Sequence, residues 1–144
     1  MSKHDGKHHR RHSFRVTWDG KVVPGVDRVS PLVRLVEVIT VRDGSSPGGS
    51  GHTVPGRIGT EPVTIERPAG PDGAFEDWAR TPADIASKKD VTVEVLDREG
   101  GVLASYRLRR CWPSEYRVVL LGGRARAVAV EKLRLENDGW EHLS

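Results

Sequence analysis

The longest apolar run of the sequence is residues 32–41, LVRLVEVITV, which directly follow Pro31. Val and Ile dominate the run, and both of its alternating faces are largely apolar. Branched side chains favour strands, and strands covered on both faces read as near-continuous apolar runs. We therefore predict a long strand here, buried on both faces, or buried on one face and packed against a partner. A helix is the competing interpretation, which the Val and Ile content disfavours.

Residues 42–56, RDGSSPGGSGHTVPG, follow this strand and contain almost no core-type side chains. A connection of this length is longer than usual, and such loops are commonly functional or disordered. The glycine-rich stretch 44–51 lacks the Gly-Lys-Ser/Thr of a phosphate-binding loop. A solvated linker is therefore a better interpretation of this stretch than a nucleotide site.

Further strands are predicted where apolar and polar residues alternate with a period of two. These strands are residues 14–18, 21–23 after an Asp-Gly turn, 57–67, 91–95, 106–109 and 125–136. In the last of them the apolar phase slips between Val130 and Leu133, which predicts a β-bulge near Glu131 and Lys132. The predicted core residues include Trp78, Val93, Tyr106 and Trp112.

One helix is predicted, because Phe75, Trp78 and Ala79 follow the i, i+3, i+4 spacing of a helical face. Thr81 is a plausible N-cap for another turn, which would begin at Pro82 and run through Ile85 and Ala86. Six or seven strands with one helix indicate a mainly β protein. We expect a small antiparallel β-barrel or sandwich with one α-helix.

The composition is that of a soluble globular protein with a single domain. The chain has 144 residues and a mass of 15.9 kDa, with 36% apolar and 30% charged residues and a mean hydropathy of −0.49. No stretch is long and apolar enough to predict a membrane span, and the N-terminus lacks the apolar region of a Sec signal peptide. The single cysteine, Cys111, excludes a disulfide within the chain.

The formal charge of +3 belongs to the first twelve residues, MSKHDGKHHRRH. They contain four Lys or Arg and one Asp, which leaves 19 basic and 19 acidic residues in the rest of the chain. We predict a disordered basic, His-rich arm over 1–12 and one β domain over 13–144. His8 and His12 could bind transition metals adventitiously. The basic side chains could contact nucleic acid or an acidic partner, which leaves a non-enzymatic binding module as the alternative function.

No catalytic signature is present, so we expect a protein that is not an enzyme and needs no cofactor or metal ion. There is no G-x-S-x-G motif, Cys111 is predicted to be a buried core residue, and His52 and His142 are predicted to be exposed.

Long apolar strands in so small a domain need a second layer to bury their side chains, and a neighbouring subunit is the simplest source of that layer.

Short segments along nearly the whole domain resemble, in order and spacing, the tail-tube family of contractile phages, typified by the T4 tail tube. The same family includes tube proteins of extracellular contractile injection systems. The segments are 14–19 (FRVTWD), 29–30 with Leu32, 37–39, 42–44, 54–56, 62–67 (PVTIER), Phe75, Trp78, 91–97 (VTVEVLD), 112–113, 128–131 with Leu133 and Leu135, and 138–140. The resemblance covers about residues 13–141.

The resemblance implies a barrel-like fold whose six copies form rings that stack into a tube. A contractile sheath would surround the tube, a baseplate would start it, and its lumen would carry effector protein or DNA. This copy would be a main tube subunit or a tube initiator, assembled in the cytoplasm and released as an extracellular or virion-like particle. The residues implied in subunit and ring contacts are Glu37, Ile39, Arg42, Asp43, Val54, Pro55 and Gly56.

Overall fold

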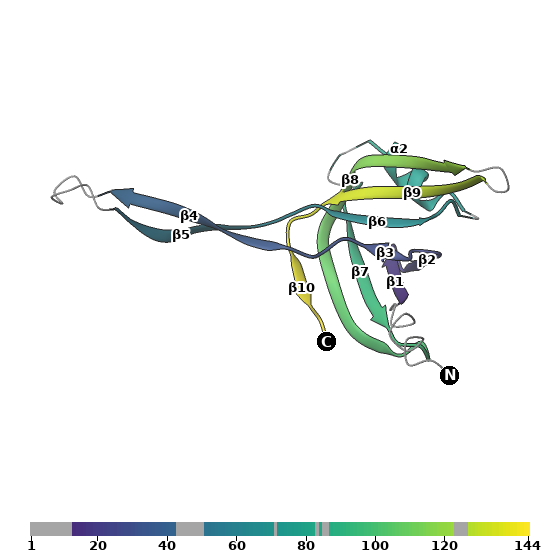
Figure 1. Ribbon diagram of the computed structural model, residues 1–144, viewed down its shortest axis with the longest axis horizontal. Helices are drawn as coiled ribbons and strands as arrows, with labels where there is room; N and C mark the ends of the chain where they lie inside the picture. Colours follow the sequence, from purple (N-terminus) through teal and green to yellow (C-terminus); the bar gives the residue numbers. More distant parts are fainter. Residues whose placement is uncertain (1–12, 43–50, 71, 83, 85–86, 123–126) are drawn as a thin grey trace.

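The computed structural model describes residues 13–42, 51–70, 72–82, 84, 87–122 and 127–144. In this part of the chain, ten strands and one helix form the fold, which confirms the mainly β class (Figure 1). The elements are β1 (Ser13–Trp18), β2 (Lys21–Val23), β3 (Arg28–Val29), β4 (Arg34–Arg42), β5 (Gly51–Thr60), β6 (Val63–Pro68), α2 (Ala74–Arg80), β7 (Lys89–Leu96), β8 (Val102–Gly122), β9 (Ala127–Glu136) and β10 (Trp140–His142).

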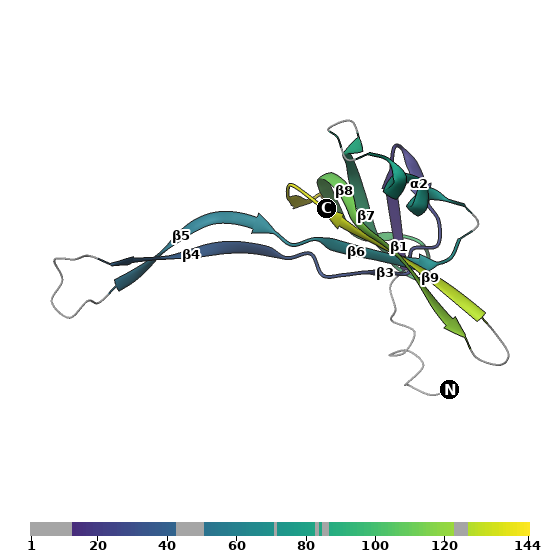
Figure 2. The same cartoon turned by 90° about the horizontal axis from the view of Figure 1, so that it is seen from above.

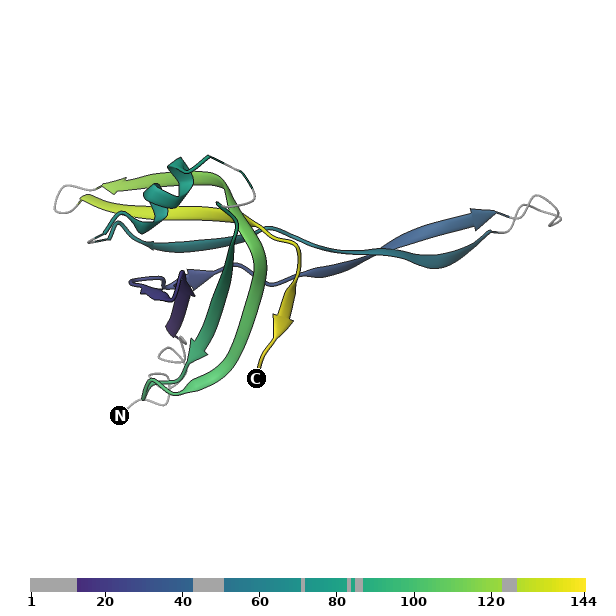
Figure 3. The ribbon, with the colours of Figure 1, turned by 180° about the vertical axis from the view of Figure 1, so that it is seen from behind.

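Strand β8 joins the two halves of the main sheet, whose order is β2-β1-β7-β8-β9-β6-β3. Its residues 102–111 pair with β7, and its residues 112–122 pair with β9. Between these parts, Arg110 has a positive φ of 50° and the register with β9 shifts between Pro113 and Glu115. Figure 3 shows β8 curving at this place. The sheet therefore folds over on itself into a partly closed barrel.

The core lies between the two halves of this sheet. Its fully buried members come from β1, β6, β7, β8 and β9: Val16, Val63, Ile65, Val91, Leu108, Cys111, Leu133 and Leu135. Helix α2 adds Phe75 and Trp78, whose rings lie 6.0 Å and 4.8 Å from that of Trp18. Val93 is also buried as predicted, whereas Tyr106 and Trp112 are only half-buried.

Helix α2 forms where the sequence predicts it, but Thr81 is not an N-cap. The backbone N–H of Thr81 donates to the Trp78 carbonyl (3.0 Å), and its hydroxyl donates to the Asp77 carbonyl (3.0 Å). Both groups therefore end the existing helix instead of starting another turn. Ile85 and Ala86, predicted in that second turn, lie outside the described residues.

The predicted bulge near Glu131 and Lys132 is wrong, because β9 keeps one register through both residues against β6 and against β8. Glu131 is buried and shares the inward face with Leu133 and Leu135. Val128 and Val130 belong to the opposite face, and Val128 is 44% exposed. The apparent slip in phase arises because an acid occupies a core position and valines occupy the outer face.

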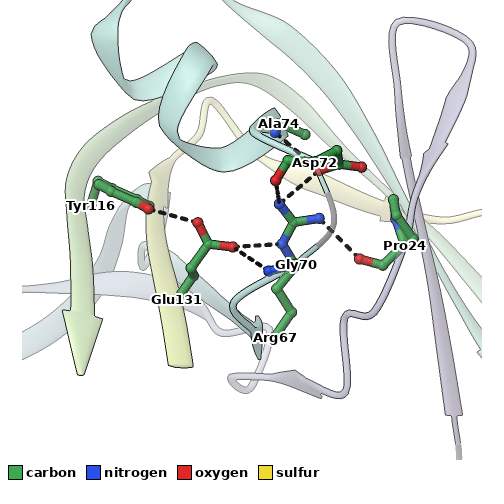
Figure 4. A network of polar contacts seen from close by, with 7 residues as sticks. All are labelled: Pro24, Arg67, Gly70, Asp72, Ala74, Tyr116 and Glu131. Atoms are coloured by element: carbon green, nitrogen blue, oxygen red, sulfur yellow. Dashed lines mark hydrogen bonds and ion pairs between the residues drawn. The ribbon is translucent and has the colours of Figure 1, made fainter. Parts of the chain in front are cut away.

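The partner of this buried acid is Arg67, whose side chain is fully buried. Its Nε donates to Glu131 Oε2 (2.9 Å) and its Nη1 to the Pro24 carbonyl (3.1 Å). Nη2 donates to Asp72 Oδ1 (2.8 Å) and to the Asp72 carbonyl (3.1 Å), as Figure 4 shows. The guanidinium also lies 4.3 Å from the centre of the Phe75 ring. One side chain thus connects β6, β9 and the segment that enters helix α2.

The remaining contacts of Glu131 complete the network. The Tyr116 hydroxyl donates to Glu131 Oε1 (2.6 Å), and the Gly70 backbone N–H lies 3.4 Å from Oε2. Burial, with the nearby Glu131 carboxylate, raises the pKa of Tyr116 to about 12, so its phenol remains a donor. A side chain at Gly70 would place its Cβ 3.0 Å from Arg67 Cζ, which explains the need for glycine there.

Replacing Arg67→Met should lower the free energy of unfolding by about 3–5 kcal/mol, because Glu131 then stays buried without its cation. The matched control is Arg80→Met, which removes an exposed pair with Glu76 and should cost less than about 0.5 kcal/mol. Urea unfolding of the monomer, followed by tryptophan fluorescence, measures both. Equal losses in the two variants would contradict this role for Arg67. Adding Glu131→Leu to Arg67→Met should recover part of the loss.

The thiol of Cys111 should not react in the folded protein. Its side chain is fully buried, and burial raises the pKa of the thiol to about 12. Iodoacetamide at pH 8 should leave it unmodified until urea unfolds the chain, as intact-mass spectrometry would record. Rapid modification without urea would show that this part of the core opens to solvent.

Candidate assembly surface

Strands β4 and β5 form a two-stranded arm that projects far from the rest of the chain (Figures 1 and 2). They pair with each other, and every residue of β4 is exposed. The prediction that residues 32–41 form a buried strand is therefore wrong for the single chain. The strand is present, but it extends beyond the two halves of the main sheet, so no second layer covers it.

The arm carries large apolar side chains in spite of this exposure. Those of β4 and β5 that are at least 38% exposed are Leu35, Val36, Val38, Ile39, Val41 and Ile58, with Val38 at 71%. Isolated two-stranded ribbons are marginally stable in water, and contiguous exposed apolar patches usually mark interaction sites. The arm is thus the strongest candidate for a contact with another chain.

The predicted long loop 42–56 is wrong at both of its ends, because Arg42 belongs to β4 and residues 51–56 belong to β5. Val54 is the cross-strand partner of Ile39, and Pro55 is the partner of Val38. Gly and Pro conceal this strand in the sequence, although Val54 and Ile58 lie within it. Residues 43–50 of the predicted loop lie outside the described residues.

Of the seven predicted contact residues, the arm brings five close together: Glu37, Ile39, Val54, Pro55 and Gly56. A Cβ on Gly56 would lie 2.5 Å from Glu37 Oε1 and 2.8 Å from Ile39 Cδ1, so the opposing side chains leave room for glycine only. Arg42 lies farther out, opposite Gly51 at the end of the ladder. Asp43 lies outside the described residues.

The base of the arm is fastened to β10. The Arg34 guanidinium lies 4.0 Å from the centre of the Trp140 ring, and its Nη2 donates to the Trp140 carbonyl (2.7 Å). The indole N–H of Trp140 in turn donates to the Val33 carbonyl (3.3 Å). These contacts hold β4 at the point where it leaves the barrel.

Asn137 fastens the other strand of the arm at the same place. Its Nδ2 donates to the Glu61 carbonyl (3.1 Å), and its Oδ1 accepts a hydrogen bond from the Thr60 hydroxyl (2.6 Å). The arm therefore leaves the barrel in a defined direction. The sequence did not identify Arg34, Asn137 and Trp140 as anchors, because their partners are 76 to 107 positions away and no local pattern connects them.

A second exposed apolar surface lies at the far end of the β8–β9 hairpin, which we call the tip (residues 118–122 and 128–130). Its exposed members are Val118 (45%), Leu120 (79%), Leu121 (55%) and Val128 (44%). The tip and the arm lie at opposite ends of the molecule (Figures 1 and 3). The second part of β8 was not predicted, although the apolar run Val118–Leu121 is typical of a strand.

A hollow of about 480 Å³ lies beside the tip. It is lined by Ser13, Val26, Asp27, Arg28, Glu66, Pro68, Leu121 and Val130. These residues include no histidine, cysteine or lysine. Among the described residues, no three His, Cys, Asp or Glu side chains are grouped so that they could hold a metal ion, and no helix is long and apolar enough to cross a membrane.

The histidines of the described residues are exposed, as predicted. His52 is on β5, and His142 is on β10 with its ring 5.0 Å from that of Tyr106. His8 and His12, the possible adventitious metal ligands, lie outside the described residues, as does the rest of the basic N-terminal segment 1–12.

Solved structures with a similar fold include components of contractile particles. One is from the sheath-tube complex of an extracellular contractile injection system, PVC, in its extended state, with a TM-score of 0.77 and 19% identity over 100% of this chain and 99% of that chain. A second is from the tube-terminating cap of the anti-feeding prophage, with a TM-score of 0.73 and 23% identity over 91% and 87%. A third is from the six-fold symmetrised baseplate of that prophage, with a TM-score of 0.71 and 16% identity over 92% and 93%.

Comparison with curated protein sequences finds no match. The family model described as T4-like virus tail tube protein gp19 matches residues 10–141, which is nearly the whole chain. The strands, helix α2 and the projecting arm are thus found in a chain that also carries the sequence profile of this family. The chain belongs to the T4-like virus tail tube protein gp19 family.

Proposed function

We propose that this protein is a subunit of the inner tube of a contractile injection particle, as a main tube component or as the tube initiator at the baseplate. Six copies form a ring, and the rings stack around a central channel. The observation that carries the proposal is the two-stranded arm, whose apolar side chains the chain itself leaves exposed. Family membership and the six-fold symmetry of a structurally similar baseplate component support it.

The charge distribution suits a subunit that packs closely against identical copies. Outside residues 1–12, the chain has 19 basic and 19 acidic residues and is formally neutral. Identical neutral domains can approach without strong mutual repulsion, whereas strongly charged ones repel each other.

The proposed contacts are made by Glu37, Ile39, Arg42, Asp43, Val54, Pro55 and Gly56.

The partners of such a tube follow from its place in the particle. The outside of the tube contacts a contractile sheath, one end contacts the baseplate, and the lumen carries effector protein or DNA. Sheath and baseplate are the surroundings named for the structurally similar tube and baseplate components. The tube assembles in the cytoplasm and is released in an extracellular, virion-like particle, with no chemistry required of the subunit.

Charging the arm should abolish assembly without unfolding the subunit. Val38 is 71% exposed, so Val38→Glu should leave the circular dichroism spectrum of the monomer unchanged while buried carboxylates block the contact. Light scattering and negative-stain microscopy should show rings or tubes for the parent chain and monomers for the variant. The control is Val22→Glu on β2, which is 56% exposed and should still assemble. A parent chain that remains monomeric up to its solubility limit would overturn the main-tube proposal.

Loosening the base of the arm should weaken assembly more than it weakens the fold. Arg34→Met removes the contact with Trp140, and we expect the concentration needed for assembly to rise about 5- to 10-fold, the equivalent of about 1–1.4 kcal/mol. Arg107→Met, which removes an exposed pair with Glu141, is the control and should change neither property. If concentration-dependent light scattering gives equal shifts for both variants, the contact does not position the arm.

A further inference from the structure

We propose that the arm of one copy packs against the β8–β9 tip of a second copy of the same chain. This inference rests on the proposed function, since it requires that the chain self-assembles. It adds the receiving surface, which neither the family match nor the arm itself identifies.

The tip, like the arm, exposes apolar side chains to solvent. Side-chain exposure rises along the inward face of β8, from the half-buried Tyr116 through Val118 (45%) to Leu120 (79%). These residues share a face with buried Glu131, since Val118 is the cross-strand partner of Glu131. The barrel and helix α2 therefore bury the start of this face and leave its end in solvent.

The tip also has an open strand edge. Residues 115–122 of β8 pair with β9 on one side, and no other strand of the described residues pairs with them on the other. A long, apolar and open edge is a template for pairing with another chain. The opposite face of the hairpin adds Leu121 and Val130, which also line the adjacent hollow.

The dimensions of the arm fit this edge. Strand β4 has nine residues, which at about 3.3 Å per residue corresponds to about 30 Å. Residues 115–122 of β8 offer about 26 Å of open edge by the same measure. Both outer edges of the arm are also unpaired within the described residues. Both of its strands, like the tip, carry exposed apolar side chains.

A second copy is the occupant that satisfies both surfaces at once. Every chain carries one arm and one tip, so a single kind of contact covers both at equal stoichiometry. An arm-to-arm contact would leave every tip exposed. Because the two surfaces lie at opposite ends of the molecule (Figures 1 and 3), the contact is head-to-tail and can repeat from copy to copy.

Complementation between two charged variants tests the pairing. Val38→Glu disables the arm and keeps the tip, whereas Leu120→Glu disables the tip and keeps the arm; their side chains are 71% and 79% exposed. Neither variant should build long assemblies alone. The mixture should give a particle of twice the mass that either variant forms by itself, because one arm–tip contact can then be made. Mass photometry and light scattering measure these species.

Crosslinking locates the contact. A Val38→Cys/Leu120→Cys chain treated with a flexible bis-maleimide should give a ladder of dimers, trimers and larger products, whereas each single variant should remain monomeric. Val38→Cys/Val22→Cys is the control and should give no ladder. The native Cys111 is buried and does not contribute.

The outcomes separate this inference from the proposed function. If the parent chain assembles but the Val38→Cys/Leu120→Cys chain gives no ladder, or if Leu120→Glu assembles as the parent does, the arm–tip contact is overturned and the tube proposal stands. If the parent chain neither assembles nor crosslinks, the arm–tip contact and the main-tube proposal are both overturned.

Discussion

The fold depends on the buried ion pair between Arg67 and Glu131, which joins β6 to β9 inside the barrel. Arg67 also binds Asp72, and this contact holds the segment that enters helix α2 against β6 and β9. Helix α2 adds Phe75 and Trp78 to the core, and Tyr116 on the inward face of β8 is half-buried against that core. Val118 and Leu120 continue that face in solvent. One polar network in the core thus connects two strands with the segment that enters helix α2, and the exposed part of the β8 face lies beyond Tyr116, a member of that network.

The arm, at the other end of the molecule, is also exposed to solvent. Strands β4 and β5 have no packing partner within the described residues, so their hydrogen-bonded ladder and the anchors at their base keep them in place. Such a ribbon is marginal as an isolated hairpin. In the proposed assembly, a neighbouring copy supplies the layer that the described residues lack, which accounts for the apolar composition of the arm.

The sequence was sufficient where the signal is local. Period-two alternation located β1 and β7, and the spacing of Phe75, Trp78 and Ala79 located α2. The strand predicted over 57–67 contains β6, but the structure divides it, because β5 ends at Thr60 and β6 begins at Val63. It failed where a residue's environment depends on distant parts of the chain. Residues 32–41 look buried because they are apolar, yet burial depends on what lies opposite. The phase of β9 looked broken because Glu131 balances Arg67, which is 64 positions away.

The site was predictable only in part, for a related reason. Resemblance pointed to Glu37, Ile39 and Gly56, and the fold brings them together on the arm. It did not indicate that these residues form a two-stranded, hydrogen-bonded ribbon. A flexible loop would lose conformational entropy on every contact, whereas a preformed ribbon has already lost it on folding. The close fit of Gly56 between Glu37 and Ile39 fixes the local structure of the ribbon. An arm of this kind can select one register on its partner, which a tube built from identical repeats requires.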